Sequence, residues 1–228
     1  MTFTHHLLPV EQGALPLTIA RAGGAGAAVV IMPSAFGIAA DLEAQMEELA
    51  AEASAVVALD PFFRDDPGPA PYHDMARVMT RLQVLDRERA HRDLRTAIDW
   101  VRGQERGQAV VILGICFGGP YALLAAADGA VDGVVTWHGT RMESYLERAS
   151  EMRCPMRHHF GGVDPFVPPA AVAAVRAAFA GHRDVRVLVH EGATHGFSHR
   201  AAPQAYDAPA ERAGMDSLRE LIASAARA

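Results

Sequence analysis

Segment 114–119, with the sequence GICFGG, places one reactive side chain, Cys116, between glycines. An apolar run over 109–113 precedes it and a small-residue run over 120–127 follows, so the pattern predicts a strand, a sharp turn and a helix. Such a turn is typical of a nucleophile elbow, whose residues two before and two after the nucleophile must be nearly free of side chain. Both are glycine here. A second interpretation is a buried structural cysteine in a glycine-rich turn, as nucleotide-binding folds also make.

Two motifs further along the chain supply an acid and a histidine. Asp164 lies in GGVDPFVP after a predicted strand over 156–160, and His195 lies in GATHGF after a predicted strand over 185–190. The carboxyl ends of parallel strands converge on one crevice, so residues far apart in sequence meet there. Nucleophile, acid and histidine is also the chain order of this kind of triad. We therefore predict that Cys116, Asp164 and His195 form a catalytic triad.

The elements that must position these residues alternate between strands and helices. Strands are expected over 17–20 at an edge, and over 28–32, 55–59, 109–113, 131–137, 156–160 and 185–190. Helices are expected over 41–53 with Asp41 as N-cap, over most of 73–102 with a break near 86–90, and over 120–127, 169–180 and 208–226. This alternation predicts an α/β fold of three layers, with a mostly parallel sheet and helices on both faces. No change in composition suggests more than one domain over residues 1–228.

Composition excludes several classes of function. The chain has 228 residues and a net charge of −6, and it has no lysine, which excludes Schiff-base chemistry and serine–lysine dyads. We expect no nucleic-acid partner and no membrane, because there is no basic patch and no apolar stretch of spanning length. The N-terminal residues lack the pattern of a signal peptide. With Cys154 expected to pack as a small apolar residue, a free thiol at Cys116 favours the reducing cytoplasm.

With these motifs in place, the chain resembles the dienelactone hydrolase family of the α/β-hydrolase fold. The resemblance runs from about residue 28 to residue 197, and it rests on the motifs around Cys116, Asp164 and His195. A cysteine at the elbow is the distinguishing feature, since most of the superfamily uses serine. The resemblance implies a Cys–His–Asp triad and hydrolysis of an ester or enol-lactone, typically in the breakdown of aromatic compounds. No cofactor is expected.

The substrate-binding residues depart from the family pattern. The best-known members have a glutamate, two residues before the Phe-Gly of the first loop, that holds the resting thiol; here that position is Ser34. They also bind the substrate carboxylate with two arginines, one of them four residues after the catalytic histidine. That position is His199, with Arg200 next to it, and the second arginine has only Arg77 and Arg81 nearby. We take Arg81 as the candidate. The fold and reaction type therefore carry over, but the dienelactone substrate does not.

The chemistry expected at this site is acyl transfer to sulfur. A thiol is a good nucleophile only as thiolate, and the imidazole of His195 and the N-terminus of the following helix both favour that form. Asp164 is expected to orient His195 and to stabilise its imidazolium form. The backbone N–H groups of Phe117 and Ala35 are the expected oxyanion donors. A thioester would form and would then be hydrolysed by a water that His195 activates.

Other histidines offer alternatives. His5 and His6 look like a metal-binding pair, but without a third ligand we interpret them as part of a frayed terminus, and we expect no metal site. His158 and His159 lie in a strand and are expected to point to opposite faces of the sheet. His138 ends a predicted strand on the crevice side, where lining the pocket and a hydrogen-bonded structural role are equally compatible with its position.

Three functions compete. The leading one is a cysteine-dependent hydrolase of small esters or enol-lactones, whose only expected partner is its small-molecule substrate. The second is a hydrolase or acyl-transfer enzyme for another carbonyl substrate, reached by changing the pocket around Ser34 and His199. The third is a non-catalytic, redox-sensing thiol protein on the same fold. The acid and the histidine argue against the third, since sensing needs neither.

Overall fold

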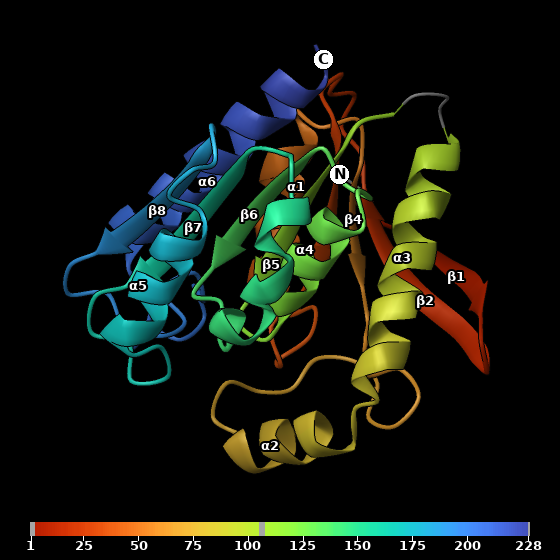
Figure 1. Cartoon of the computed structure of the whole chain (residues 1–228). Coiled ribbons are helices and arrows are strands. Elements are labelled where there is room, and N and C mark those ends of the chain that lie inside the picture. Colours follow the sequence, from red (N-terminus) through yellow and green to blue (C-terminus); the bar gives the residue numbers. More distant parts are fainter. Residues whose placement is uncertain (1–2, 105–107, 228) are drawn as a thin grey trace.

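One sheet organises the part of the chain that the computed structural model describes, residues 3–104 and 108–227 (Figure 1). Its eight strands lie in the order β1-β2-β4-β3-β5-β6-β7-β8. They are β1 (Thr4–Val10), β2 (Gly13–Ala20), β3 (Ala28–Met32), β4 (Val56–Leu59), β5 (Val110–Ile115), β6 (Gly133–Trp137), β7 (Met156–Gly161) and β8 (Val185–His190). Strands β1, β2 and β4 pair antiparallel and the other pairs are parallel, which confirms the mostly parallel sheet.

Helices cover both faces of this sheet. They are α1 (Ala40–Ala50), α2 (Met75–Val84), α3 (Arg87–Gln104), α4 (Gly118–Ala127), the 3-10 helix η1 (Met142–Glu151), α5 (Pro169–Ala178) and α6 (Ala208–Ala225). Apolar side chains of α1 and α6 pack on one face, and those of α3, α4 and α5 pack on the other. Figure 1 shows α2 standing off from the sheet at one end. The three-layer α/β architecture predicted from the sequence is confirmed.

The central strands are buried on both faces, which explains why they read as continuous apolar runs. In β3, Val29 and Ile31 pack toward α1 and α6, whereas Val30 and Met32 pack toward the other helices, and all four side chains are fully buried. The carboxyl ends of β3, β5, β6, β7 and β8 therefore lie along one edge of a rigid layer, and the loops that follow them start from fixed positions.

The N-terminal region differs from the prediction. Strand β2 lies inside the sheet, and the edge is β1, which pairs with β2 through a tight turn. Gln12 and Gly13 both have positive φ, 57° and 150°, in a turn without the Asn-Gly or Asp-Gly signal that marks most such hairpins. The frayed terminus predicted for His5 and His6 is wrong, because both lie in β1 and the His6 ring stacks on Trp100 at 4.8 Å.

The helices match the prediction in one detail and differ from it in another. The expected break is confirmed slightly earlier, between Val84 and Arg87. The N-cap predicted at Asp41 is wrong, since Ala39 occupies that position without a side-chain bond. Asp41 lies inside the first turn of α1, and its carboxylate accepts a hydrogen bond from the Tyr72 hydroxyl at 2.8 Å. Asp41 thus makes a long-range hydrogen bond with Tyr72 and does not cap the helix.

The His158–His159 pair in β7 behaves as its strand periodicity predicts. His158 bonds to Thr136 Oγ1 and stacks on Phe179, on the side that α5 covers. His159 bonds to Ser217 of α6 on the opposite side. The two rings therefore cannot share a ligand.

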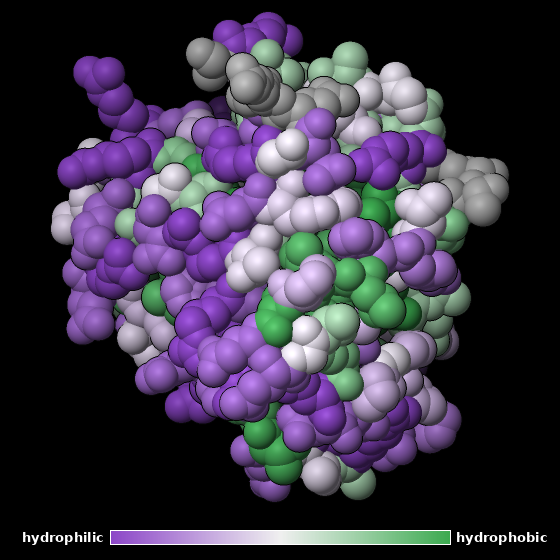
Figure 2. Space-filling model, turned by 90° about the vertical axis from the view of Figure 1, so that its right-hand side faces the viewer, coloured by the Kyte–Doolittle hydropathy of each residue, from purple (hydrophilic) through white to green (hydrophobic). Residues whose placement is uncertain are grey.

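Hydrophilic residues cover most of the face that α3 and β1 present, with hydrophobic residues in separate patches between them (Figure 2). Among residues 3–104 and 108–227, no helix combines the length and the apolar character needed to cross a membrane.

Candidate active site

Cys116 lies at the turn between β5 and α4 with φ at +55°, a left-handed conformation that costs energy for any residue with a side chain. The two flanking glycines are a steric necessity. A Cβ on Gly114 would lie 2.5 Å from the carbonyl oxygen of Gly118, and a Cβ on Gly118 would collide with the carbonyl oxygen of Met32. The turn therefore has the geometry of a nucleophile elbow, and it exposes one reactive atom, the Cys116 sulfur.

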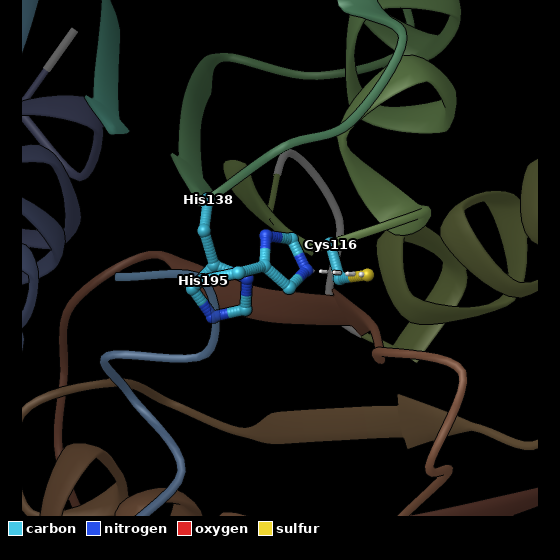
Figure 3. Close-up of side chains that lie close together, drawn as sticks. All are labelled: Cys116, His138 and His195. Atoms are coloured by element: carbon cyan, nitrogen blue, oxygen red, sulfur yellow. Dashed lines mark hydrogen bonds between the residues drawn. The ribbon is translucent and has the colours of Figure 1, made fainter. Parts of the chain in front are cut away.

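The elbow, the turn after β7 and the loop after β8 bring three side chains together. His195 Nε2 lies 3.2 Å from Cys116 Sγ, an interaction drawn as a dashed line in Figure 3. On the other side of the ring, His195 Nδ1 lies 2.8 Å from Asp164 Oδ2. The second carboxylate oxygen accepts the backbone N–H of Phe166 at 2.8 Å, which fixes the carboxylate. The three residues predicted as a triad thus form one continuous chain of contacts.

The electrostatics of the Cys116–His195–Asp164 contacts favour a protonated His195. Burial lowers the pKa of His195, but the charge of the Cys116 sulfur and the hydrogen bond with Asp164 outweigh it and raise this pKa from 6.5 to about 10. The imidazole therefore holds a proton at neutral pH, and its Nε2 faces the Cys116 sulfur. The other cysteine contrasts with this: burial raises the pKa of Cys154 to about 12, so its thiol stays neutral.

The backbone N–H groups of Ala35 and Phe117, the predicted oxyanion donors, are not used within the protein. Among residues 3–104 and 108–227, neither N–H donates a hydrogen bond. Both residues are almost fully buried. Gly118, at the start of α4, lies against the end of β3. This contact fixes the start of the loop that carries Ala35 relative to α4. A donor must be free in this way to bind the oxyanion of a tetrahedral intermediate.

Arg81, the candidate for binding a substrate carboxylate, contacts the protein itself. Its fully buried guanidinium donates to the carboxylate of Asp66 at 2.9 Å, to the carbonyl of Gly68 at 3.0 Å and to the carbonyl of Ala35 at 3.1 Å. It also lies over the Phe62 ring at 4.4 Å. The contact with Ala35 holds the peptide unit next to one predicted oxyanion donor. Arg81 is therefore placed to hold that donor in position.

The other candidate arginines are also paired within the protein. Arg200 reaches away from the sulfur to Glu48 of α1 and Glu211 of α6, and these contacts raise its pKa further above the usual range. Arg77 pairs with Asp66, as Arg81 does. None of these three arginines offers an unpaired guanidinium to a ligand.

His199 takes part in a buried network. Its Nδ1 lies 3.1 Å from the Tyr72 hydroxyl, which itself donates to Asp41. Because the hydroxyl proton goes to the carboxylate, His199 Nδ1 is the donor to the hydroxyl oxygen. Burial lowers the pKa of His199 to about 4, with Asp41 opposing and His195 adding to the effect, so this ring is neutral at pH 7. The sequence does not reveal Asp41 as part of this network, because its partner there, Tyr72, is 31 residues away.

Three further side chains border the site. Ser34 is buried, and its hydroxyl accepts the N–H of Phe36 at 3.3 Å. His138 is fully buried, with its ring centroid 4.7 Å from that of His195. Phe166 is 60% exposed and approaches His195 edge-on at 5.0 Å. Phe166 was not among the predicted site residues, although an aromatic residue between two prolines just after Asp164 could have indicated a place in the site. Apart from His195 and Asp164, the side chains that border the site are thus uncharged and partly aromatic.

Comparison with known proteins adds to this geometry. The dienelactone hydrolase family model matches residues 17–225. A carboxymethylenebutenolidase of Pseudomonas putida is 32% identical over 187 residues, covering 80% of this chain and 79% of that one. Two solved structures share the fold. The dienelactone hydrolase of Anabaena variabilis gives a TM-score of 0.72 at 18% identity over 96% of each chain. A dienelactone hydrolase-like promiscuous phosphotriesterase from metagenomic libraries gives 0.77 at 23% identity over 93% of each.

Proposed function

The chain belongs to the dienelactone hydrolase family and is a hydrolase of ester or lactone bonds, and we propose that Cys116 is its nucleophile. The observation that carries this proposal is the unbroken chain of contacts from Cys116 Sγ through His195 to Asp164. A redox-sensing thiol would need neither partner. The cytoplasmic location expected for a free thiol is part of the same proposal.

The reaction divides into two acyl transfers. The thiolate of Cys116 attacks the carbonyl carbon, and the oxyanion that forms accepts the N–H groups of Ala35 and Phe117. Collapse of this intermediate leaves a thioester and expels an alkoxide or enolate, which takes the proton from His195 Nε2. Neutral His195 then removes a proton from a water molecule, and the oxygen of that water attacks the thioester. The second collapse releases the acid and restores the thiolate beside the imidazolium. Asp164 holds the ring through both steps.

The substrate class follows from leaving-group chemistry and from the charges around the sulfur. An enol-lactone or aryl ester expels a stabilised anion, which suits a site whose proton donor has a pKa near 10. His199 is neutral, Ser34 carries no charge, and Arg81 and Arg200 are bound to protein acceptors. We therefore propose a small substrate with a neutral acyl portion, in place of the anionic lactone that an arginine would bind.

Steady-state kinetics on three substrates tests both parts of the proposal: a neutral aryl ester, a neutral enol-lactone and the same lactone carrying a carboxylate. Cys116→Ala is expected to lower kcat/KM by about 10³-fold or more on the neutral substrates, whereas Cys154→Ala serves as the matched control and retains activity. The carboxylate is expected to raise KM. Full activity of Cys116→Ala would contradict the nucleophile, and a lower KM for the anionic lactone would contradict the substrate class.

A further inference from the structure

His138 is a buried histidine that the proposed mechanism does not use. It follows β6 directly, and its φ of +39° is one of few positive values at residues other than glycine in the described part of the chain. The neighbouring Cys116 has the same kind of strain, and its N–H donates to the carbonyl of Trp137, the residue before His138. Strained residues at two adjacent strand ends are a reason to look for a function.

The ring of His138 has one satisfied and one unsatisfied nitrogen. Nε2 lies 2.9 Å from the hydroxyl of Ser198. Nδ1 is buried and has no hydrogen-bond partner among residues 3–104 and 108–227. A neutral imidazole carries a lone pair on one of its two ring nitrogens. A buried ring nitrogen without a partner is costly unless something else binds it.

Three metal-binding atoms converge at this place. One nitrogen of His138, one nitrogen of His195 and the sulfur of Cys116 lie within 4.8 Å of one another (Figure 3). We propose that Cys116, His138 and His195 form a binding site for Zn²⁺, and that the bound ion inhibits the hydrolase by occupying the sulfur. The inhibition rests on the proposed function, whereas the binding does not. One thiolate and two imidazoles are ligands that zinc prefers, with a fourth tetrahedral position left for water.

The hydrogen bonds around the two rings suit this role. Metal-bound histidines nearly always use their second nitrogen to bond a carboxylate, a carbonyl or another polar group. Asp164 occupies Nδ1 of His195, which leaves Nε2 for the ion. Ser198 occupies Nε2 of His138, which leaves the unpartnered Nδ1. Each ring is therefore already oriented by a second contact, and the free nitrogen of each is a candidate ligand.

Binding is a proton exchange. Zn²⁺ accepts the lone pair of the Cys116 thiolate and one nitrogen lone pair from each ring, and the proton on His195 Nε2 leaves to solvent. Ligand distances of about 2.3 Å to sulfur and about 2.0–2.1 Å to nitrogen place tetrahedral ligand atoms about 3.5 Å apart. Separations of up to 4.8 Å must therefore shorten by as much as about 1.3 Å when the ion binds. No oxidation or reduction takes place.

Binding is tested with ZnCl₂ alone, by calorimetry on the full chain after treatment with a chelator. One ion per chain is expected, with affinity at least tenfold lower in His138→Ala and lost in Cys116→Ala. His190→Ala is the matched control, because His190 and His159 form another close pair, 3.0 Å apart, that holds no cysteine. With Co²⁺ in place of Zn²⁺, wild type should show thiolate-to-metal charge-transfer absorption. Equal affinity in wild type and His138→Ala, or absorption that persists in Cys116→Ala, would overturn the site.

Activity measured with and without ZnCl₂ separates this inference from the proposed function. Zinc is expected to abolish ester hydrolysis by wild type, a chelator to restore it, and His138→Asn to need at least tenfold more zinc for the same loss. Comparing each variant with its own zinc-free rate makes the test independent of its basal activity, and thermal melting shows that each variant is folded. Stoichiometric zinc binding by a protein without esterase activity would leave the site intact and refute the proposed function. Unchanged hydrolysis at saturating zinc would refute the inhibition.

Discussion

Gly114→Ala tests how strictly the elbow depends on the absence of a side chain. The added Cβ would lie 2.5 Å from the carbonyl oxygen of Gly118, 2.8 Å from its carbonyl carbon and 3.0 Å from the Cβ of Ala122. Ordinary van der Waals contact begins at 3.4 Å, so β5 and the first turn of α4 must separate by about 0.9 Å (3.4 − 2.5). Two of the three atoms are backbone, and a rotamer change cannot relieve them.

A shift of this size acts on catalysis and on stability. Cys116 lies between the two segments that must separate, so the sulfur and the N–H of Phe117 both move relative to His195. Misplacement by about 1 Å costs about 10²-fold in rate. Overpacking of a tight interior also destabilises a fold by about 1–3 kcal/mol. We expect kcat for a neutral aryl ester to fall about 10²-fold, with a lower free energy of unfolding.

The matched control is Gly103→Ala. Gly103 lies in the last turn of α3, and a Cβ there would meet no described atom within 4 Å. Alanine in a helix is favoured over glycine, so this variant is expected to keep wild-type activity and to gain up to about 1 kcal/mol. Steady-state kinetics and urea unfolding measure both variants. Wild-type kcat in Gly114→Ala, or a loss in Gly103→Ala as large as in Gly114→Ala, would refute the steric argument.

The site leads to four further predictions. Asp164→Asn is expected to lower kcat by about 10³–10⁴-fold with little change in KM, because His195 loses its orienting carboxylate; a KM effect alone would contradict this. Arg81→Met is expected to lower kcat by up to about 10²-fold on neutral and anionic substrates alike, since one oxyanion donor loses its support; a KM rise confined to anionic substrates would instead make Arg81 a binding residue. Alkylation of Cys116 by iodoacetamide, followed by mass spectrometry, should change little between about pH 7 and about pH 9 while Cys154 stays unmodified, because the pKa of His195 is raised to about 10. Protonation of His195 in the folded state also stabilises the fold, because its pKa rises from 6.5 to about 10 on folding. This stabilisation is complete below pH 6.5, and the free energy of unfolding measured with urea should lose it as the pH rises through about 10.

The elbow could be predicted from the sequence because its constraint is local. The backbone approaches itself so closely around Cys116 that only glycine fits at positions 114 and 118, and this requirement is visible in six consecutive letters. Asp164 and His195 could be placed because parallel strands end at one edge of a sheet, whatever the length of chain between them. Topology therefore supplies a rough position for each of these side chains.

The surroundings of the sulfur could not be predicted, because they depend on contacts between distant loops. Tyr72 meets His199 across 127 residues, and its other partner, Asp41, had a plausible local role as a helix cap. Arg81 lies upstream of the helix that contains Asp93, where the family pattern suggests an arginine, but its orientation toward Ala35 depends on how the loop around Gly68 folds. Residue type and spacing carry no information about such packing.

The formation of a thioester on Cys116 is the central claim, and acid quenching during turnover tests it most directly. Wild type is mixed with excess p-nitrophenyl acetate, quenched in acid within the first turnovers, digested and analysed by mass spectrometry. One acetyl group per chain is expected on the peptide that contains Cys116, removed by hydroxylamine, and none on the peptide that contains Cys154. Turnover with no acetyl group on Cys116, or with the label on another residue, would contradict it.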